Sequence, residues 1–249
     1  MQKLMMILSG GQDSTTALFL AKEQFDEVHA ISFNYGQRHI SEIIAAKAVA
    51  KIAQVKSHEI VDATDCLVSS SPLTSSMELE EYESYNEMIH KVGDKVENTF
   101  VPMRNTFFAM VAANRAIAKK CTHIGLGVCE SDSANYPDCT GAYLDSLQSC
   151  ITKSLSSGPK RYIEIYAPLV NLTKAEAVEI AHKDIKCWEA LAYTQTSYDG
   201  KYPPTGKNHA NLLRAQAFGE AGYPDPLVLR AVVEGLMELP TTSNYKEIS

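Results

Sequence analysis

The sequence has no close pair of cysteines, no long apolar run and no excess of positive charge. Its six cysteines are scattered, and no CxxC pair is present, which argues against both a metal knot and a redox dithiol. We expect them to stay reduced and to serve as small core residues, because free cysteine is among the most buried side chains. They stand at positions 66, 121, 129, 139, 150 and 187.

Charge and hydrophobicity argue against two further classes of protein. The formal net charge is −7, from 23 basic and 30 acidic residues, so no broad cationic field attracts a nucleic-acid backbone without sequence preference. No apolar run approaches the roughly 20 residues of a membrane span. The apolar start MQKLMMILSG runs directly into a glycine turn, unlike a signal peptide. We therefore expect a cytoplasmic protein that binds neither generic nucleic acid nor a membrane.

Strand-like and helix-like segments alternate from the start of the chain. Buried apolar runs predict strands at 3–8, 28–33 and 58–61, and helical spacing of apolar residues predicts helices at 14–24 and 40–55. Repeated units of this kind form a parallel sheet covered by helices on both faces. The sequence therefore predicts a doubly wound α/β fold.

The rest of the chain continues this pattern after an interruption at 62–100. That stretch is serine-rich and then acidic, and predicts a long loop with one short helix, either an active-site cover or a solvated excursion. Thr173 and Glu176 predict a capping box that starts a helix at Lys174. With 249 residues, the chain fits one main domain, 1–190, and a small C-terminal helical extension, 191–249. Further elements are expected at 106–119 (helix), 123–128 (strand), 141–155 (helix), 161–166 (strand), 212–218 (helix) and 227–236 (helix).

The string SGGQDS lies between the first predicted strand and the first predicted helix. A glycine pair there leaves backbone N–H groups pointing at an anion, and the helix dipole favours phosphate. A carboxylate in such a loop is explained if a magnesium ion bridges it to the phosphates. The string is neither a Walker A loop nor a dinucleotide fingerprint, which disfavours the corresponding kinases and dehydrogenases. The candidate nucleotide-binding residues are Ser9, Gly10, Gly11, Gln12, Asp13 and Ser14, with Asp13 as the magnesium ligand.

This loop resembles the pyrophosphate loop of the ATP pyrophosphatase superfamily, whose members cleave ATP between the α and β phosphates. Four more strings narrow the resemblance: FNYGQRH at 33–39, VPMRN at 101–105, NYPDC at 135–139 and PLVNLTK at 168–174. They occur in the order found in the 7-cyano-7-deazaguanine synthase family. The chain is similar to that family from residue 4 or so to residue 226 or so.

The resemblance implies a two-stage reaction. ATP adenylates the carboxylate of 7-carboxy-7-deazaguanine, ammonia displaces AMP to give an amide, and a second ATP drives dehydration to the nitrile. Arg104 and Lys174 would neutralise the departing pyrophosphate, as a multi-donor fork and as a point charge. Either residue could instead be an ordinary solvated residue at a helix start. Asp138 would orient substrate or magnesium, or form an ordinary turn.

The same resemblance points to residues for the deazaguanine ring and to the assembly. Tyr35, Gln37 and His39 follow a strand end, where ligands enter parallel sheets, and either contact the ring or pack as a loop. The YPDC string adds Tyr136 and Pro137 as substrate contacts. A homodimer is implied by the family resemblance alone.

The chain departs from the family where the family has a zinc knot of four cysteines. Structural zinc wants thiolate or imidazole, and His209 alone cannot build a four-coordinate site. We therefore predict that zinc is absent. The four metal positions are occupied by Ser197, Thr205, Asn208 and Asn211, within a retained scaffold of Thr194, Thr196, Tyr198, Gly200, Gly206, Leu213 and Arg214.

Two substitutions near the presumed substrate extend the departure. Met103 replaces a usual glycine, which restricts close backbone approach, and Thr140 replaces a usual arginine. The main expectation is therefore a diverged ligase that passes the activated carboxylate to ammonia or to an amine of a partner protein, resembling enzymes of antiphage defence operons. Two alternatives stay open: an ordinary zinc-free nitrile-forming synthase, and a non-catalytic nucleotide-binding partner protein.

Overall fold

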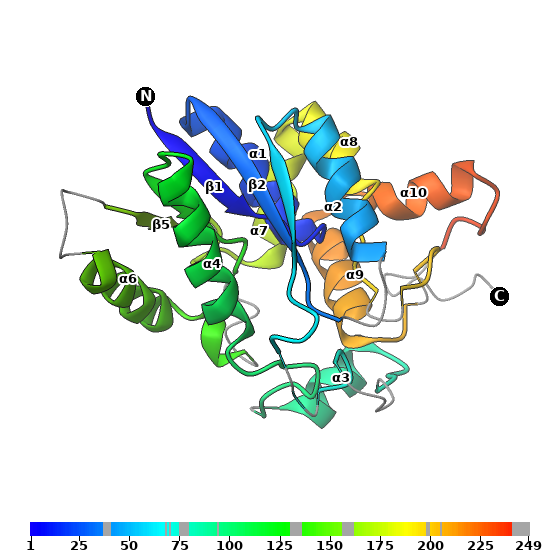
Figure 1. The fold of residues 1–249 in the computed structure, drawn as a ribbon. Helices are drawn as coiled ribbons and strands as arrows, with labels where there is room; N and C mark the ends of the chain where they lie inside the picture. Colours follow the sequence, from blue (N-terminus) through cyan, green and yellow to red (C-terminus); the bar gives the residue numbers. More distant parts are fainter. Residues whose placement is uncertain are drawn as a thin grey trace.

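The sheet has the topology of a doubly wound fold. The computed structural model describes residues 1–36, 41–67, 69, 71–74, 80–93, 95–129, 136–155, 162–197, 200–204 and 206–240. In this part of the chain, five strands pair in parallel in the order β3-β2-β1-β4-β5, which confirms the predicted fold class (Figure 1). The strands are β1 (Lys3–Ile7), β2 (Glu27–Asn34), β3 (His58–Asp62), β4 (His123–Gly125) and β5 (Glu164–Tyr166).

The helices lie close to the segments that hydrophobic periodicity predicts. One helix, α8, was not predicted as a separate element. The described helices are α1 (Gln12–Gln24), α2 (Ser41–Ile52), α3 (Tyr85–Val92), α4 (Arg104–Ala118), α6 (Gly141–Leu155), α7 (Lys174–Lys183), α8 (Ile185–Leu191), α9 (His209–Ala221) and α10 (Pro226–Val233), with a 3₁₀ turn at Pro137–Cys139.

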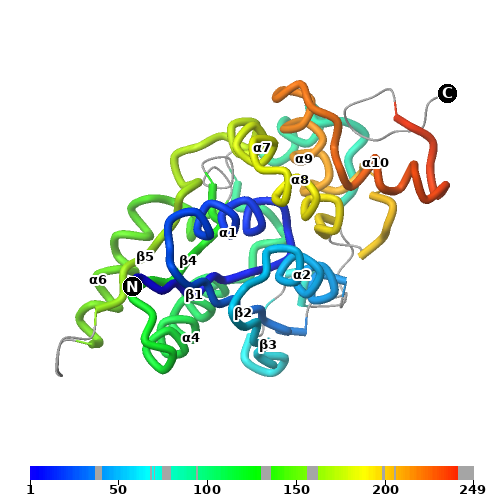
Figure 2. The backbone as a smooth tube through the Cα atoms, turned by 90° about the horizontal axis from the view of Figure 1, so that it is seen from above, coloured from blue at the N-terminus to red at the C-terminus, as the bar shows by residue number. Residues whose placement is uncertain are grey.

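Strand β1 divides its side chains between two cores. Leu4 and Met6 join the core formed by α1, α2, α7, α8 and α9, whereas Met5 joins the core under α4 and α6. Helices therefore cover both faces of the sheet, with α1 and α4 on opposite sides (Figure 2). A strand buried on both faces reads as a continuous apolar run rather than an alternating one, as the sequence of β1 does.

The C-terminal segment shares the main core. Ala217 and Phe218 of α9 pack with residues of α1 and α7. The boundary placed at residue 190 stays a prediction. None of the described helices combines the length and the apolar character that crossing a bilayer requires.

The described part of segment 62–100 packs against α9. It contains the one short helix that the sequence predicts, α3, which lies beside α9 beyond the carboxyl ends of the strands (Figure 1). Tyr82, Met88 and Val92 form a small core with Leu212 of α9, and Tyr82 N donates to Lys207 O at 2.9 Å. Positions 68, 70, 75–79 and 94 lie outside the described residues. Closure of this segment over a ligand stays a prediction.

Candidate active site

A cavity of about 270 Å³ opens at the carboxyl ends of β1 and β4. Strand order reverses between these two strands, and open α/β sheets bind their ligands in the crevice at such a switch point. The lining comes from the 9–14 loop, from the ends of β2 and β4, from the start of α4 and from the C-terminal segment. The fold therefore brings most of the predicted site together.

The loop after β1 is shaped by close backbone contacts. Gly10 has a φ of +85°, and a Cβ there would lie 2.6 Å from Glu42 O. After β4, a Cβ on Gly127 would lie 2.5 Å from Ser14 Cα. Both positions therefore require glycine, and the ends of β1 and β4 meet tightly at the start of α1.

The start of α1 has the features of an anion site. Its N-cap, Gly11, supplies no side-chain hydrogen bond to the first turn, and the amides at a helix N-terminus favour the binding of an anion. Ser9 Oγ lies 2.9 Å from Ser14 Oγ and accepts a hydrogen bond from Gly11 N at 3.2 Å. The two hydroxyls predicted from the sequence thus lie together beside this helix N-terminus.

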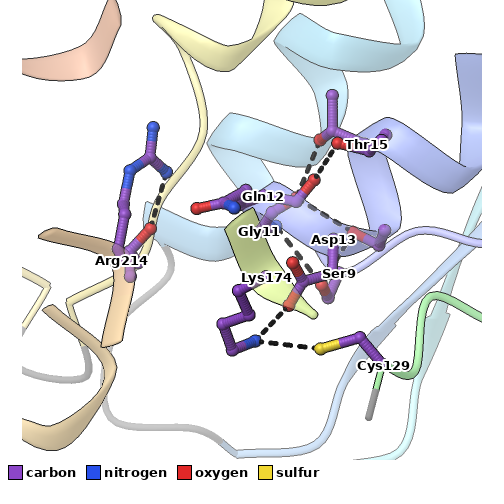
Figure 3. A network of polar contacts seen from close by, with 11 residues as sticks. Ser9, Gly11, Gln12, Asp13, Thr15, Cys129, Lys174 and Arg214 are labelled. Carbon is purple, nitrogen blue, oxygen red and sulfur yellow. Dashed lines mark hydrogen bonds and ion pairs between the residues drawn. The ribbon is translucent and has the colours of Figure 1, made fainter. Parts of the chain in front are cut away.

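Lys174 reaches the same loop from α7. The predicted capping box is confirmed, because Thr173 Oγ1 accepts from Glu176 N at 3.2 Å and Glu176 Oε2 accepts from Thr173 N at 2.8 Å. Lys174 Nζ donates to Asp13 Oδ2 at 2.6 Å and to Cys129 Sγ at 3.4 Å (Figure 3). The Lys174 side chain is 12 % exposed, so it is not an ordinary solvated lysine.

The Asp13–Lys174 pair bears on the magnesium prediction. The carboxylate and the Ser9 and Ser14 hydroxyls are oxygen donors, which magnesium prefers, and one or two carboxylates with substrate phosphates are its usual set. These residues therefore fit magnesium with bound ATP. In the structure, the ammonium of Lys174 is the positive charge beside Asp13.

Arg104 stands among two acidic groups and an aromatic ring. Its Cζ lies 5.9 Å from the centroid of the Tyr35 ring. Burial raises the pKa of Glu42 to about 7, and burial also raises the pKa of Asp138, while the Arg104 charge opposes both shifts. Asp138 Oδ2 is buried with no hydrogen-bond partner among the described residues.

Glu42 lines the cavity and was missed by the sequence reasoning. It lies in the first turn of α2, three residues after the FNYGQRH string ends. The signal that could have identified it is an acidic residue in the first helical turn directly after a string already assigned to the site.

Aromatic rings form the wall of the cavity on the β2 side. Phe33 stacks on Phe108 with centroids 4.1 Å apart, and Tyr35 lies 5.5 Å from Phe108. Tyr136 also lines the cavity, and its hydroxyl lies 2.6 Å from Thr99 Oγ1. Of the other ring-contact candidates, Pro137 is exposed and outside the lining. Gln37 and His39 lie outside the described residues.

The C-terminal segment closes the opposite wall. Gln195 N donates to Gly10 O at 2.9 Å, which docks this segment on the phosphate loop. Arg214 holds the segment through hydrogen bonds from Nη1 to Thr194 Oγ1 at 2.7 Å and to Thr196 Oγ1 at 2.8 Å.

A second pair of acidic and basic side chains lies at this wall. His209 lines the cavity, and its Nε2 lies 3.9 Å from Glu97 Oε2, which belongs to segment 62–100. Burial raises the pKa of Glu97 to about 7, with the charge of Glu80 adding to the shift. No pattern in the sequence indicates that these two residues meet, because the contact spans more than 100 positions.

The two substitutions that were expected near the substrate have local explanations. Met103 is 64 % exposed with a φ of +64°, a left-handed conformation that accounts for glycine being usual there. Thr140 Oγ1 accepts from Tyr143 N at 3.1 Å and so caps the start of α6. Neither residue lines the cavity.

The fold and this loop define a nucleotide-binding α/β enzyme of the ATP pyrophosphatase class. The family model described as "Queuosine biosynthesis protein QueC" matches residues 3–222. The chain is 40 % identical to the 7-cyano-7-deazaguanine synthase of Gloeobacter violaceus, over 91 % of this chain and 96 % of that protein. It is 37 % identical to that of Chromobacterium violaceum, over 94 % of this chain and 96 % of that protein. The chain therefore belongs to the 7-cyano-7-deazaguanine synthase (QueC) family of ATP-dependent C–N ligases.

Two solved structures are also similar at a lower level. They are a predicted tRNA methyltransferase subunit from Methanocaldococcus jannaschii, with a TM-score of 0.45, and an NH₃-dependent NAD synthetase from Campylobacter jejuni, with a TM-score of 0.40. Both are 15 % identical to this chain, and the family assignment does not depend on them.

Proposed function

We propose that this enzyme converts 7-carboxy-7-deazaguanine into 7-cyano-7-deazaguanine, using ammonia and ATP. The observation that carries the proposal is one cavity with a phosphate-binding loop and Lys174 at one side and aromatic rings at the other, lined also by Arg104. This arrangement occurs in a chain that is 40 % identical to a 7-cyano-7-deazaguanine synthase.

The loop side of the cavity suits the leaving pyrophosphate. The amides of the first turn of α1 and the hydroxyls of Ser9 and Ser14 would donate to the β and γ phosphates. Lys174, already held within 2.6 Å of Asp13, supplies a positive charge at the position where negative charge develops. Magnesium, held by Asp13 and phosphate oxygens, would add charge neutralisation there.

The aromatic side suits a flat bicyclic substrate. Tyr35 and Phe108 offer ring faces against which a deazaguanine can pack, and Arg104 lies beside the Tyr35 ring and interacts electrostatically with Glu42 and Asp138. A guanidinium in this position would orient the substrate carboxylate toward the α phosphate. Little covalent chemistry falls to the protein, because adenylation depends mainly on positioning and charge neutralisation.

Glu42, which lines the cavity, is suited to proton transfer. Attack by ammonia and the later dehydration both release protons, and a carboxyl group with a pKa of about 7 exchanges protons readily near neutral pH. We assign Glu42 the role of general base. Asp138, near Arg104, would orient the guanidinium.

The structure weakens the case for a different acceptor amine. That expectation depended partly on Met103 and Thr140, and both residues lie outside the cavity lining. The relatives named 7-cyano-7-deazaguanine synthase also favour ammonia as the amine. A non-catalytic role is disfavoured because the loop, Arg104 and Lys174 are all present. A homodimer stays part of the proposal.

The test measures AMP release that depends on 7-carboxy-7-deazaguanine. Lys174→Met is expected to slow it roughly 10²–10³-fold, because a positioned charge on a transition-state anion is removed. Lys183→Met, an exposed change on the same helix, is the matched control and is expected to keep full activity. A Lys174→Met enzyme within about threefold of the control would contradict the role assigned to Lys174.

A further inference from the structure

Three of the four positions that carry zinc-binding cysteines in the family lie together as a buried hydrogen-bonded cluster. Ser197 Oγ accepts from Asn208 Nδ2 at 2.8 Å and from Asn211 Nδ2 at 3.1 Å. The exposed fractions of these residues are 3 %, 4 % and 0 %. The fourth position, Thr205, lies outside the described residues.

The chemistry of this cluster does not suit zinc. A hydroxyl and two carboxamides are neutral and weakly donating, whereas structural zinc sites are built from thiolates and imidazoles. The nearest imidazole in sequence, His209, lines the active-site cavity 3.9 Å from Glu97. Among the described residues, no group of three histidine, cysteine, aspartate or glutamate side chains is placed to hold a metal.

The cluster joins two pieces of the active-site wall. Ser197 follows Gln195, whose backbone N–H donates to Gly10 O of the phosphate loop at 2.9 Å. Asn208 is the N-cap of α9 and accepts from Asn211 N at 3.0 Å. Helix α9 in turn packs in the core with α7, the helix that begins at Lys174.

We infer that Ser197, Asn208 and Asn211 form a metal-free knot that fixes segment 194–197 over the phosphate loop and makes the enzyme independent of zinc. Two buried hydrogen bonds to Ser197 Oγ fasten the segment to the N-cap and the first turn of α9. The inference does not depend on the product of the reaction, because its tests measure zinc content, hydrogen exchange and ATP binding.

The first experiment uses the unmodified protein. Protein purified without chelators is analysed for zinc by inductively coupled plasma mass spectrometry, and its Tm is measured with and without a strong chelator. We expect well under one zinc per chain and a Tm that the chelator leaves unchanged within about 1 °C. Near-stoichiometric zinc, or a chelator-induced loss of several degrees, would overturn the inference, since structural zinc contributes directly to folding.

The second experiment removes the shared acceptor with Ser197→Ala, which leaves the N-cap of α9 intact. Exchange of the Gln195 amide, followed by mass spectrometry, is expected to accelerate roughly tenfold, with a Tm loss of about 3–9 °C. ATP should bind several-fold more weakly. Ser146→Ala, an exposed change on α6, is the matched control and is expected to alter none of these quantities.

If the cluster stabilises the fold but does not position segment 194–197, Ser197→Ala should give a different result. The Tm would fall, while ATP affinity and exchange at Gln195 would match the Ser146→Ala control. The same outcome for Asn211→Ala, compared with the exposed Asn114→Ala on α4, would show that the cluster does not position the segment.

Discussion

Replacing Arg214 with methionine is expected to destabilise the protein strongly. The Arg214 side chain is 1 % exposed and pairs with Asp225, with Nε at 2.6 Å from Oδ2 and Nη2 at 2.8 Å from Oδ1. The same guanidinium donates to Thr194, Thr196 and the backbone oxygen of Leu191. Removing one partner of a buried ion pair costs about 3–5 kcal/mol, because a charged group stays buried without its partner.

The assay is thermal unfolding. For a chain of this size each kcal/mol shifts the Tm by about 2–4 °C, so we expect Arg214→Met to lower the Tm by about 6–20 °C. Arg115→Met is the matched control, because Arg115 makes a comparable ion pair with Glu59 at 2.8 Å but is 40 % exposed. Exposed pairs contribute about 0–1 kcal/mol, so its Tm should fall by less than about 4 °C.

A double variant tests whether Arg214 and Asp225 stabilise the protein as a pair. Arg214→Met combined with Asp225→Asn should cost less than the sum of the two single changes, since the second change removes the isolated charge. If the Tm losses of the two single variants simply add, or if Arg214→Met lowers the Tm no more than Arg115→Met does, the buried pair does not stabilise the C-terminal segment.

Three further changes test the remaining parts of the site. The pKa of Glu97 is raised from 4.5 to about 7, so the folded protein binds this proton more tightly and loses stability as pH rises through that window. Glu97→Gln should therefore be more stable than the wild type by about 3 kcal/mol at pH 8 and equal to it near pH 4, by chemical denaturation, whereas exposed Glu179→Gln should show no such difference. Met103→Gly relieves a φ of +64° and should change stability by about 0 to +1 kcal/mol; a loss above about 1 kcal/mol would contradict the strain. Glu42→Gln should slow amide and nitrile formation roughly 10²-fold in quenched-flow assays while sparing the adenylate, and equal slowing of both would reject its role as base.

Local signals account for the parts of the fold that the sequence predicts well. The apolar run of β1 and the capping box of Thr173 and Glu176 are set by residues close in the chain, and both were confirmed. Helix α8 was missed because Asp184 ends α7 and also caps α8, by accepting from Lys186 N and Cys187 N, so no break marks the boundary.

The parts of the site that could not be predicted depend on contacts between distant residues. The loop and Lys174 were found because their strings carry the chemistry themselves. The Arg214–Asp225 pair and the meeting of His209 with Glu97 arise only from packing of the closing helices. The left-handed backbone of Met103 was not predicted either, although the glycine that is usual at this position in the family was a signal of it.

The most direct measurement is mass spectrometry of the products formed from ATP, magnesium, ammonium and 7-carboxy-7-deazaguanine by the purified protein. The account predicts 7-cyano-7-deazaguanine, together with AMP and pyrophosphate, with ammonium as the sole nitrogen source and without added zinc. An adenylate or amide that goes no further, or a deazaguanine mass that appears on an added partner protein instead, would contradict it.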